Sequence, residues 1–276
     1  MNAPASVAHT APPAEKVLLR EDAEGIATLT LNRPRARNSL SEALLAALGE
    51  ELANIAADRS IRTIIIRASG PVFSAGHDLK ELTARRSDPD RGRAYFKQVM
   101  DACSAVMQMI VRVPQPVIAS VEGVATAAGC QLVASCDLAV AAQDSRFQTP
   151  GVHIGLFCST PMVALSRNVA RKHAMEMLLT GDLISADDAQ RMGLINRIAA
   201  PGKAYDEALA MARKIASKSS AIIKIGKEAF YRQVEMDLAD AYAYAAEVMT
   251  ENMMARDAEE GIGAFIEKRE PRWGDR

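Results

Sequence analysis

Apolar and polar positions alternate or run together in several short segments that predict β-strands. Residues 26–31 alternate, which favours a strand with one buried face. Residues 63–66 form a continuous run, Thr-Ile-Ile-Ile, of the kind found in strands that are covered on both faces. Two further strands are predicted at 117–121 and 138–142, and a short one at 194–198.

Helical periodicity occupies most of the intervals between these strands. Ser39 to Glu42 reads as a capping box, in which Ser39 bonds a free backbone amide and Glu42 reaches back. The apolar side chains of the segment that follows fall on one helical stripe: Leu40, Leu44, Leu48, Leu52 and Ile55. Helices are also predicted from Asp78, over 93–111 and through most of the chain beyond Pro161.

The order of these elements predicts an α/β core followed by a helical appendage. Residues 1–15 are rich in Ala and Pro and lack the pattern of a signal or transit peptide, so we expect a disordered tail. The predicted organisation is therefore a tail at 1–15, a core at 16–200 and a helical C-terminal region at 201–276.

Composition narrows the class of protein. The 276 residues include 33 Lys and Arg against 34 Asp and Glu, which excludes the clustered basic excess of a nucleic-acid-binding surface. No apolar run is long enough to cross a bilayer, so we predict a soluble protein without a membrane partner. The 4 cysteines form no CxxC pair and the 4 histidines are scattered, so we expect reduced thiols, a cytoplasmic location and no metal site.

Two stretches of small residues, 73–79 and 123–131, stand where a strand or loop leads into a helix. Helix starts present free N–H groups and a positive dipole end, and small side chains let a ligand reach them. Two such donors that converge on one oxygen would form an oxyanion hole. Close helix packing is the alternative explanation for the small residues.

Both stretches resemble segments of a known family. FSAGHDLKEL at 73–82 and GVATAAGCQLVASCD at 123–137 resemble the two oxyanion segments of the crotonase superfamily, the enoyl-CoA hydratase/isomerase family. Further similarity lies at 31–41, 150–156, 185–198 and 260–273. The resemblance implies an α/β crotonase (ClpP-like) fold, a spiral of ββα units in two near-perpendicular sheets. It also implies a helical C-terminal trimerisation region, with a homotrimer or a dimer of trimers.

The resemblance also assigns roles to individual residues. The family's oxyanion donors correspond to the backbone N–H groups of His77 and Ala128, where the family usually has Gly at the second position. The implied CoA contacts are Arg33, Arg35, Ala36, Arg37, Ala75, Asp78, Leu79 and Lys80, together with Phe265 and Lys268 from a neighbouring subunit. A solvated loop is the alternative for the three arginines. No cofactor is implied, because CoA arrives as part of the substrate.

Both catalytic glutamates of the family's hydratases are missing. Their positions are occupied by Gln131, which cannot exchange protons usefully, and by Gly151, which has no side chain. One positioned acid or base contributes about 10²–10⁴ in rate, so losing both removes about 10⁴–10⁸. We therefore expect a site that polarises thioesters but hydrates them poorly.

Few side chains could replace the two missing glutamates as acid–base groups. If residues 151–153 are extended, alternation points His153 to the same side as Gly151, although a histidine held in a subunit interface is the alternative. The imidazole of His77 and the carboxylate of Glu81 are further candidates. Cys158 would need an activating partner to act as a nucleophile, and buried packing is its simpler role.

The resemblance and the missing glutamates predict an acyl-CoA-binding enzyme that stabilises a thioester enolate or oxyanion. Isomerisation, decarboxylation and thioester hydrolysis all pass through such an anion, and the residues do not choose among them. The alternative is a non-catalytic acyl-CoA-binding or regulatory protein of the same fold. A dinucleotide-binding oxidoreductase is disfavoured because no GxGxxG follows the first strand.

Overall fold

The computed structural model describes residues 16–275, so the tail predicted at 1–15 lies outside the described residues. Its centre is a six-stranded sheet that is parallel except for the antiparallel pairing of its first two strands. In spatial order the strands are β1 (Leu18–Ala23), β2 (Ile26–Leu31), β3 (Thr63–Ala68), β5 (Val117–Val121), β7 (Leu138–Ala142) and β10 (Arg197–Ala199).

A second, smaller sheet has four strands, three of which come directly after a strand of the large sheet in the sequence. It contains β4 (Val72–Ser74), β6 (Val124–Thr126), β8 (Arg146–Gln148) and β9 (Ile184–Ser185). In the successive pairs β3–β4, β5–β6 and β7–β8, the first strand joins the large sheet and the second joins the small one. This repeated step is the predicted spiral of ββα units.

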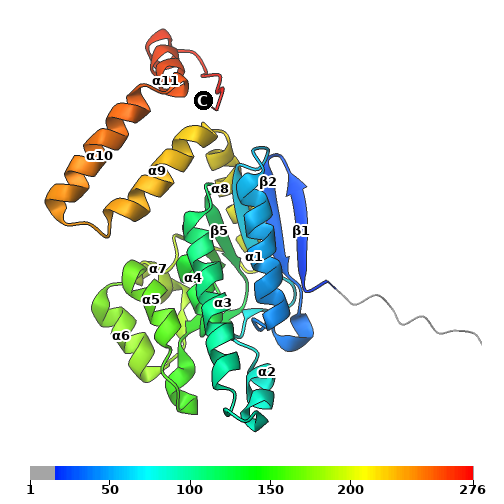
Figure 1. Ribbon diagram of the computed structural model, residues 1–276. Coiled ribbons are helices and arrows are strands. Elements are labelled where there is room, and N and C mark those ends of the chain that lie inside the picture. Colours follow the sequence, from blue (N-terminus) through cyan, green and yellow to red (C-terminus); the bar gives the residue numbers. More distant parts are fainter. Residues whose placement is uncertain (1–15, 276) are drawn as a thin grey trace, which may run out of the picture.

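Helices cover both faces of the large sheet (Figure 1). On one face lie α1 (Glu42–Ala57), α3 (Arg93–Arg112) and α4 (Ala128–Ser135), and on the other α8 (Ala204–Ala216). Ile64 and Ile66 pack with the leucines of α1, whereas Ile65 between them packs against α8. The uninterrupted run at 63–66 is therefore buried from both sides, as its pattern predicts.

Seven further helical segments complete the core of the described chain. They are η1 (Pro34–Ala36), α2 (Leu79–Ala84), η2 (Arg85–Ser87), α5 (Ser159–Asn168) and α6 (Arg171–Thr180), with η3 (Pro150–Ile154) and α7 (Ala186–Met192) at the small sheet. The predicted capping box is wrong by two residues, because the hydroxyl of Ser41, not Ser39, accepts from the N–H of Leu44. Ser39 instead takes part in an ion-pair network described below.

The C-terminal helices divide into two groups. We predicted a helical region from residue 201, and its first helix, α8, packs on β3, β5 and β7 of the large sheet. The others extend away from the core (Figure 1): α9 (Ser220–Gln233), α10 (Leu238–Met253) and α11 (Arg256–Glu267). We call these three helices the C-terminal arm.

A buried polar network joins the arm to the core. The ammonium of Lys227 on α9 lies 2.7 Å from the carboxylate of Asp137 and donates to the carbonyls of Ile110 and Gln115. Tyr231 donates to the other oxygen of Asp137 at 2.9 Å. Burial lowers the pKa of Lys227 and raises that of Tyr231, and Asp137 opposes the first shift. Since α9 has no buried residue of its own, this network is its main attachment.

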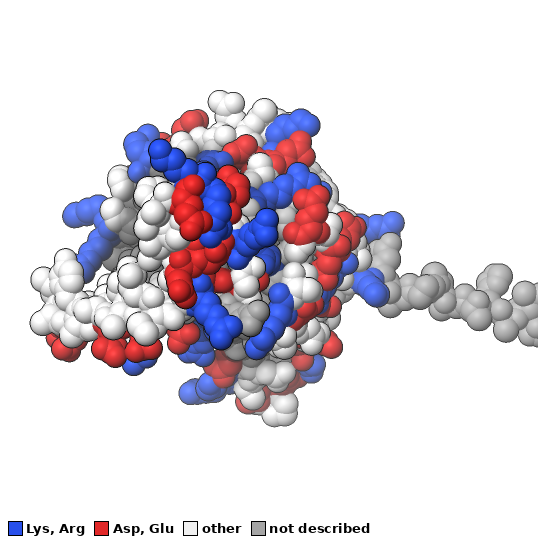
Figure 2. Space-filling model, turned by 90° about the horizontal axis from the view of Figure 1, so that it is seen from above, with Lys and Arg blue, Asp and Glu red and all other residues white. Residues whose placement is uncertain are grey.

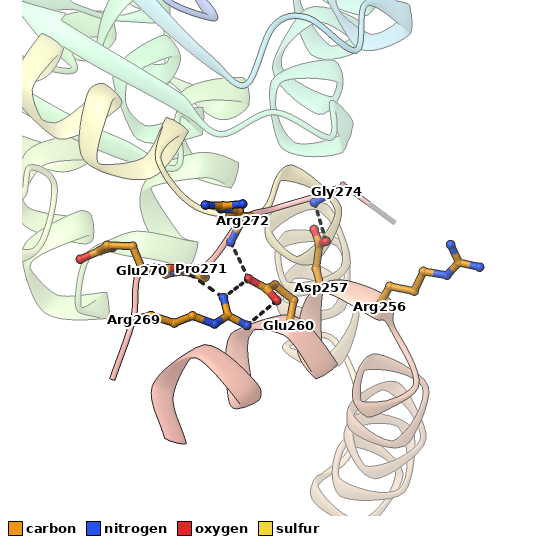
Figure 3. A pocket seen from close by; sticks show the side chains of 8 residues that line it. All are labelled: Arg256, Asp257, Glu260, Arg269, Glu270, Pro271, Arg272 and Gly274. Atoms are coloured by element: carbon orange, nitrogen blue, oxygen red, sulfur yellow. Dashed lines mark hydrogen bonds and ion pairs between the residues drawn. The ribbon is translucent and has the colours of Figure 1, made fainter. Parts of the chain in front are cut away.

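The last residues of the chain fold back on the arm (Figure 3). Asp257, at the start of α11, accepts from the Ser219 hydroxyl and from the N–H groups of Gly274 and Asp275. Glu260 holds the guanidinium of Arg269 and the N–H of Arg272. These contacts tie the two ends of the arm together beside α8.

Removing Asp137 should detach this arm. We expect Asp137→Ala to lower the free energy of unfolding by about 3–5 kcal/mol, because it leaves the buried ammonium of Lys227 unpaired. The matched control is Arg197→Ala, which breaks a pair with Glu207 whose side chains are 47% and 39% exposed. That change should cost less than about 1 kcal/mol. Chemical denaturation measures both, and equal effects would contradict the role of Asp137.

Candidate functional site

The first small-residue turn, at 74–78, joins β4 to α2. Leu40 pairs with it: its N–H donates to the carbonyl of Gly76 at 2.7 Å, and its carbonyl accepts from the N–H of Asp78 at 3.4 Å. This pairing points the N–H of His77 away from Leu40, since successive peptide groups of an extended segment face opposite sides. Within the described chain that N–H has no hydrogen-bond partner.

The second turn, at 126–128, joins β6 to α4. Ala127 has φ 52° and ψ −119°, a backbone conformation that non-glycine residues rarely adopt. Ala128 is the first residue of α4, so its N–H precedes the first hydrogen bond of the helix and lies at the positive end of the helix dipole. Strain of about 1–3 kcal/mol at Ala127 is the cost of this orientation.

The two turns are in direct contact. A Cβ placed on Gly76 would lie 2.8 Å from the Cβ of Ala127 and 3.2 Å from the nitrogen of Ala128. A Cβ on Gly129 would lie 2.4 Å from the carbonyl oxygen of Ser74. Only glycine permits this approach, so the small residues predicted to serve the site bring the His77 and Ala128 backbones side by side.

Gln131 lies one turn into α4 and is 4% exposed. Its Oε1 atom is 4.0 Å from the thiol of Cys103 on α3, which donates to it. Gly151 is also buried, and a Cβ there would lie 2.9 Å from the sulfur of Cys158 and 3.1 Å from its backbone nitrogen. Cys158 thus fills the space that a side chain at position 151 would need.

The expectation for His153 is wrong. Residues 150–154 form the 3-10 helix η3 rather than an extended segment, so alternation does not apply. The Nε2 atom of His153 donates to the carbonyl of Thr180 at 2.9 Å, at the end of α6. This contact holds the His153 ring at the C-terminal end of α6.

The other candidate acid–base groups are also engaged or buried. The carboxylate of Glu81 accepts from the N–H of Glu42, at the start of α1. Burial lowers the pKa of His77, and both of its ring nitrogens are enclosed without a hydrogen-bond partner among residues 16–275. The nearby carbonyl of Leu40 opposes this shift but does not bond the ring. His77 is therefore neutral at pH 7.

All four cysteines are buried free thiols. Burial raises the pKa of Cys103 and of Cys130 to about 12, and it also raises those of Cys136 and Cys158. The sulfur of Cys158 accepts from the N–H of Gly151 at 3.3 Å. These thiols pack in the core, which agrees with the simpler role considered for Cys158.

The arginine loop lies next to the first turn, but its members differ. The guanidinium of Arg33 donates to the carbonyl of Ser39 and lies 3.0 Å from the carboxylate of Asp78. Burial alone would raise the pKa of Asp78, yet hydrogen bonds from Arg33, Ser39 and the N–H of Lys80 hold it below its usual value. Arg33 and Asp78 therefore stabilise the loop through their side chains.

The remaining predicted CoA contacts lie on the surface around this loop. The side chains of Arg35, Arg37, Leu79 and Lys80 are exposed, and those of Ala36 and Ala75 are half-buried. The carbonyl of Arg37 accepts from the N–H of Ala75, which joins the loop to the first turn. Phe265 lies on α11 and is 85% exposed, and Lys268 directly follows the end of that helix. A single chain does not bring α11 to the loop, because α11 packs on α9 and α10.

Asn38 is a positioning residue that sequence reasoning missed. It is fully buried at φ 50°, and its amide donates to the carbonyls of Ser69 and Val72 while accepting from the N–H of Arg33. Its own carbonyl accepts from Ser74. Asparagine tolerates the left-handed region and hydrogen-bonds to nearby backbone groups. The Asn directly after Arg37 was therefore the sequence signal for a residue that positions this loop.

A hollow lies far along the chain from these turns. The cavity of about 720 Å³ in Figure 3 is lined only by residues of α11 and the C-terminal tail. Its charges are largely paired, as Arg269 is with Glu260. Residues 16–275 contain no group of three His, Cys, Asp or Glu side chains placed to hold a metal ion. None of the helices in that range has the length and apolarity that crossing a bilayer requires.

Two sheets linked by successive strand pairs, with paired turns at their helix starts, define a crotonase-fold protein. The family described as enoyl-CoA hydratase/isomerase matches residues 21–276. The chain belongs to the enoyl-CoA hydratase/isomerase family.

Individual relatives cover almost the whole chain. A protein of Rattus norvegicus named enoyl-CoA hydratase domain-containing protein 3, mitochondrial, is 50% identical over 250 residues, which is 91% of this chain and 82% of that protein. The crystal structure of an enoyl-CoA hydratase from Mycobacterium smegmatis is 55% identical with a TM-score of 0.89, covering 94% of this chain and 99% of that one. The structure of human enoyl-CoA hydratase domain-containing protein 3 is 48% identical with a TM-score of 0.89, covering 93% and 100%.

The buried imidazole of His77 should make stability depend on pH. Burial holds its pKa in the folded chain below the value of about 6.5 in the unfolded chain, so the unfolded state binds more protons and stability falls as pH drops below about 6.5. His77→Phe should flatten the fall in unfolding free energy between pH 7 and 5. His173→Gln, at a side chain that is 42% exposed, should not. Denaturant titrations at several pH values measure the unfolding free energy. An identical dependence on pH in the His77 variant and in the wild type would contradict this role of His77.

Proposed function

We propose that this protein binds acyl-CoA thioesters and stabilises their enolates in a backbone oxyanion hole. The observation that supports the proposal is the contact between the two glycine-dependent turns, since a Cβ on Gly76 would lie 3.2 Å from the nitrogen of Ala128. In the proposal, the N–H groups of His77 and Ala128 act together. Preorganised donors of this kind contribute about 10²–10³ in rate each. The thioester oxygen would accept from both and hold the negative charge that develops.

The proposed chemistry differs from hydration by two glutamates. Gln131 and Gly151 hold the family's carboxylate positions, and neither transfers protons. Loss of CO₂ from a 2-carboxyacyl thioester would form the enolate without a base, and water would then supply the proton that the α-carbon takes up. Isomerisation, decarboxylation and thioester hydrolysis remain the reactions to distinguish. A non-catalytic acyl-CoA-binding protein is the second candidate, favoured by the engagement of Glu81 and His153 in backbone contacts.

The CoA part would lie along the exposed cations of the loop. Arg35, Arg37 and Lys80 have exposed side chains suited to phosphate groups, and Arg33 with Asp78 holds the loop in place. Figure 2 shows blue and red side chains intermixed over the face seen from above, so no single-sign field covers that face. Contacts from these individual side chains would select the polyphosphate.

The proposed assembly is a homotrimer or a dimer of trimers. Large apolar side chains are exposed on η3, α6 and the arm, more than an isolated chain normally leaves in water. They include Ile154, Leu156, Leu179, Phe230, Leu238, Tyr242 and Met254. Contacts with neighbouring subunits would bury them and would bring Phe265 and Lys268 to the CoA of another chain.

The cytoplasm is the proposed location. The described cysteines are all free thiols, which fits a reducing compartment. The rat relative carries the word mitochondrial in its name, so imaging of a tagged protein against mitochondrial markers distinguishes the two compartments.

Acyl-CoA esters should bind much more tightly than the corresponding free fatty acids. The cause is the phosphate contact of Arg35, Arg37 and Lys80, which a fatty acid cannot make. The affinity should also fall as salt rises, since exposed ion pairs are screened. Calorimetry with butyryl-CoA, butyrate and free CoA measures this, and equal affinity for the ester and the acid would overturn the CoA assignment.

Wild-type protein should show little hydration of crotonyl-CoA. Gln131→Glu with Gly151→Glu should raise hydration more than either change alone, because paired carboxylates act as a unit. The gain is limited by space, since a Cβ at position 151 would lie 2.9 Å from the sulfur of Cys158. Loss of enoyl thioester absorbance follows the reaction. Ready hydration by the wild type would show that another group, Glu81 first, supplies the proton chemistry.

A further inference from the structure

We propose that the side-chain amide of Gln131 is a specificity-determining hydrogen-bond donor that selects acyl groups with an oxygen acceptor on the second or third carbon. The inference rests on the proposed function, because it assumes that a thioester occupies the two turns. It adds the class of acyl group to that function. The ligands it predicts are 3-oxoacyl and 2-carboxyacyl thioesters, rather than plain acyl or enoyl thioesters.

The orientation of the amide is set by Cys103. This thiol is fully buried on α3, and its sulfur lies 4.0 Å from Oε1 of Gln131. Burial raises the pKa of Cys103 to about 12, so the sulfur stays protonated and donates. A protonated thiol beside the amide favours the oxygen on that side, which leaves the NH₂ group on the other side. Cys103 is thus a positioning residue for Gln131.

The NH₂ group is the unpaired end of a side chain that is otherwise enclosed. Gln131 is 4% exposed, and within residues 16–275 its Nε2 atom has no hydrogen-bond partner. The enclosed side-chain atoms without a partner belong to Thr63, His77 and Gln115, and Nε2 of Gln131 is absent from that set, so it keeps access to a ligand or to water. An accessible donor without a protein partner is free to donate to water or to a ligand.

The helix directs this donor toward the two turns. The N–H of Gln131 donates to the carbonyl of Ala127 at 3.0 Å, and its carbonyl accepts from the hydroxyl of Ser135, so its backbone is fixed in the first turn of α4. Long side chains on a helix lean toward its N-terminus, which here is the Ala128 end. This lean directs the amide toward the Ala128 end of α4, where the carbons next to a thioester carbonyl would lie if the thioester bound as proposed.

Among the candidate acid–base groups described above, none offers an unengaged carboxylate to an oxygen acceptor at Gln131. Position 151 has no side chain, His77 is neutral, the carboxylate of Asp78 is paired with Arg33, and that of Glu81 bonds the start of α1. A carboxylate at position 131 would accept hydrogen bonds, whereas the oriented amide donates one. The exchange of Glu for Gln reverses the polarity of the site and hence the kind of acyl group that satisfies it.

The test compares ligands that share CoA and chain length. Acetoacetyl-CoA should bind wild-type protein about tenfold more tightly than butyryl-CoA, the effect of one well-placed hydrogen bond in a buried site. Malonyl-CoA, as an anionic acceptor, should also exceed butyryl-CoA. If only malonyl-CoA binds more tightly than butyryl-CoA, the site recognises a carboxylate. If only acetoacetyl-CoA does so, the site recognises a neutral carbonyl. Calorimetry gives the ratios directly.

Variants assign the preference to the amide. Gln131→Met should reduce the acetoacetyl-to-butyryl preference to about one, and Gln131→Glu should disfavour malonyl-CoA below butyryl-CoA. Cys103→Ser should keep the preference by retaining a donor, whereas Cys103→Ala should weaken it; a packing role alone would affect both Cys103 variants alike. Thermal unfolding confirms that each variant is folded.

The outcomes separate this inference from the proposed function. Equal affinity of wild-type protein for acetoacetyl-CoA, malonyl-CoA and butyryl-CoA, all above that of free fatty acids, overturns the role of Gln131 and leaves CoA binding intact. Absence of binding to every CoA ester overturns both. A preference that survives Gln131→Met overturns the assignment to this side chain.

Discussion

The close approach of two backbone turns is the constraint on which the other features of this molecule depend. Gly76 and Gly129 have no room for a Cβ, and the strain at Ala127 is tolerated because the surrounding contacts fix it. The small sheet exists to hold those turns: β4 and β6 pair in parallel and end where the turns begin. The loop at 33–41 is held against the first turn by hydrogen bonds of Asn38 and Leu40 and by the Arg33–Asp78 ion pair.

In the proposed function, the backbone N–H groups of His77 and Ala128 and the amide of Gln131 would donate to a bound thioester. The carboxylate of Asp78 is paired with Arg33, and that of Glu81 accepts from the N–H at the start of α1. Such donors would stabilise negative charge on a ligand without shuttling protons. Binding and polarisation of a substrate would then be separated from acid–base chemistry, because Gln131 and Gly151 hold the positions that the resemblance assigns to the two glutamates of the family's hydratases.

Sequence reasoning identified the parts of this structure that follow from local pattern. Strands 117–121 and 138–142 were predicted with their observed bounds, because buried parallel strands form short apolar runs between breaks. The strands β4, β6 and β8 were not recognised from pattern, since each has only three residues and is defined by tertiary pairing. The His153 prediction failed because Pro150 starts a 3-10 helix rather than an extended segment. The pairing of Arg33 with Asp78 joins residues 45 positions apart, which no local pattern reveals.

The four buried thiols give the folded chain its own set of conformational reporters. Thiol reagents attack the thiolate, and burial suppresses that form at each cysteine while the core also excludes the reagent. Labelling therefore requires the local structure to open, and its rate measures how often it does so. Cys103 reports on separation of α3 from α4, Cys130 on the start of α4, Cys136 on the region beside the arm's anchor at Asp137, and Cys158 on the loop around Gly151. The native cysteines therefore report on the opening of four different regions, with no need to introduce further cysteines.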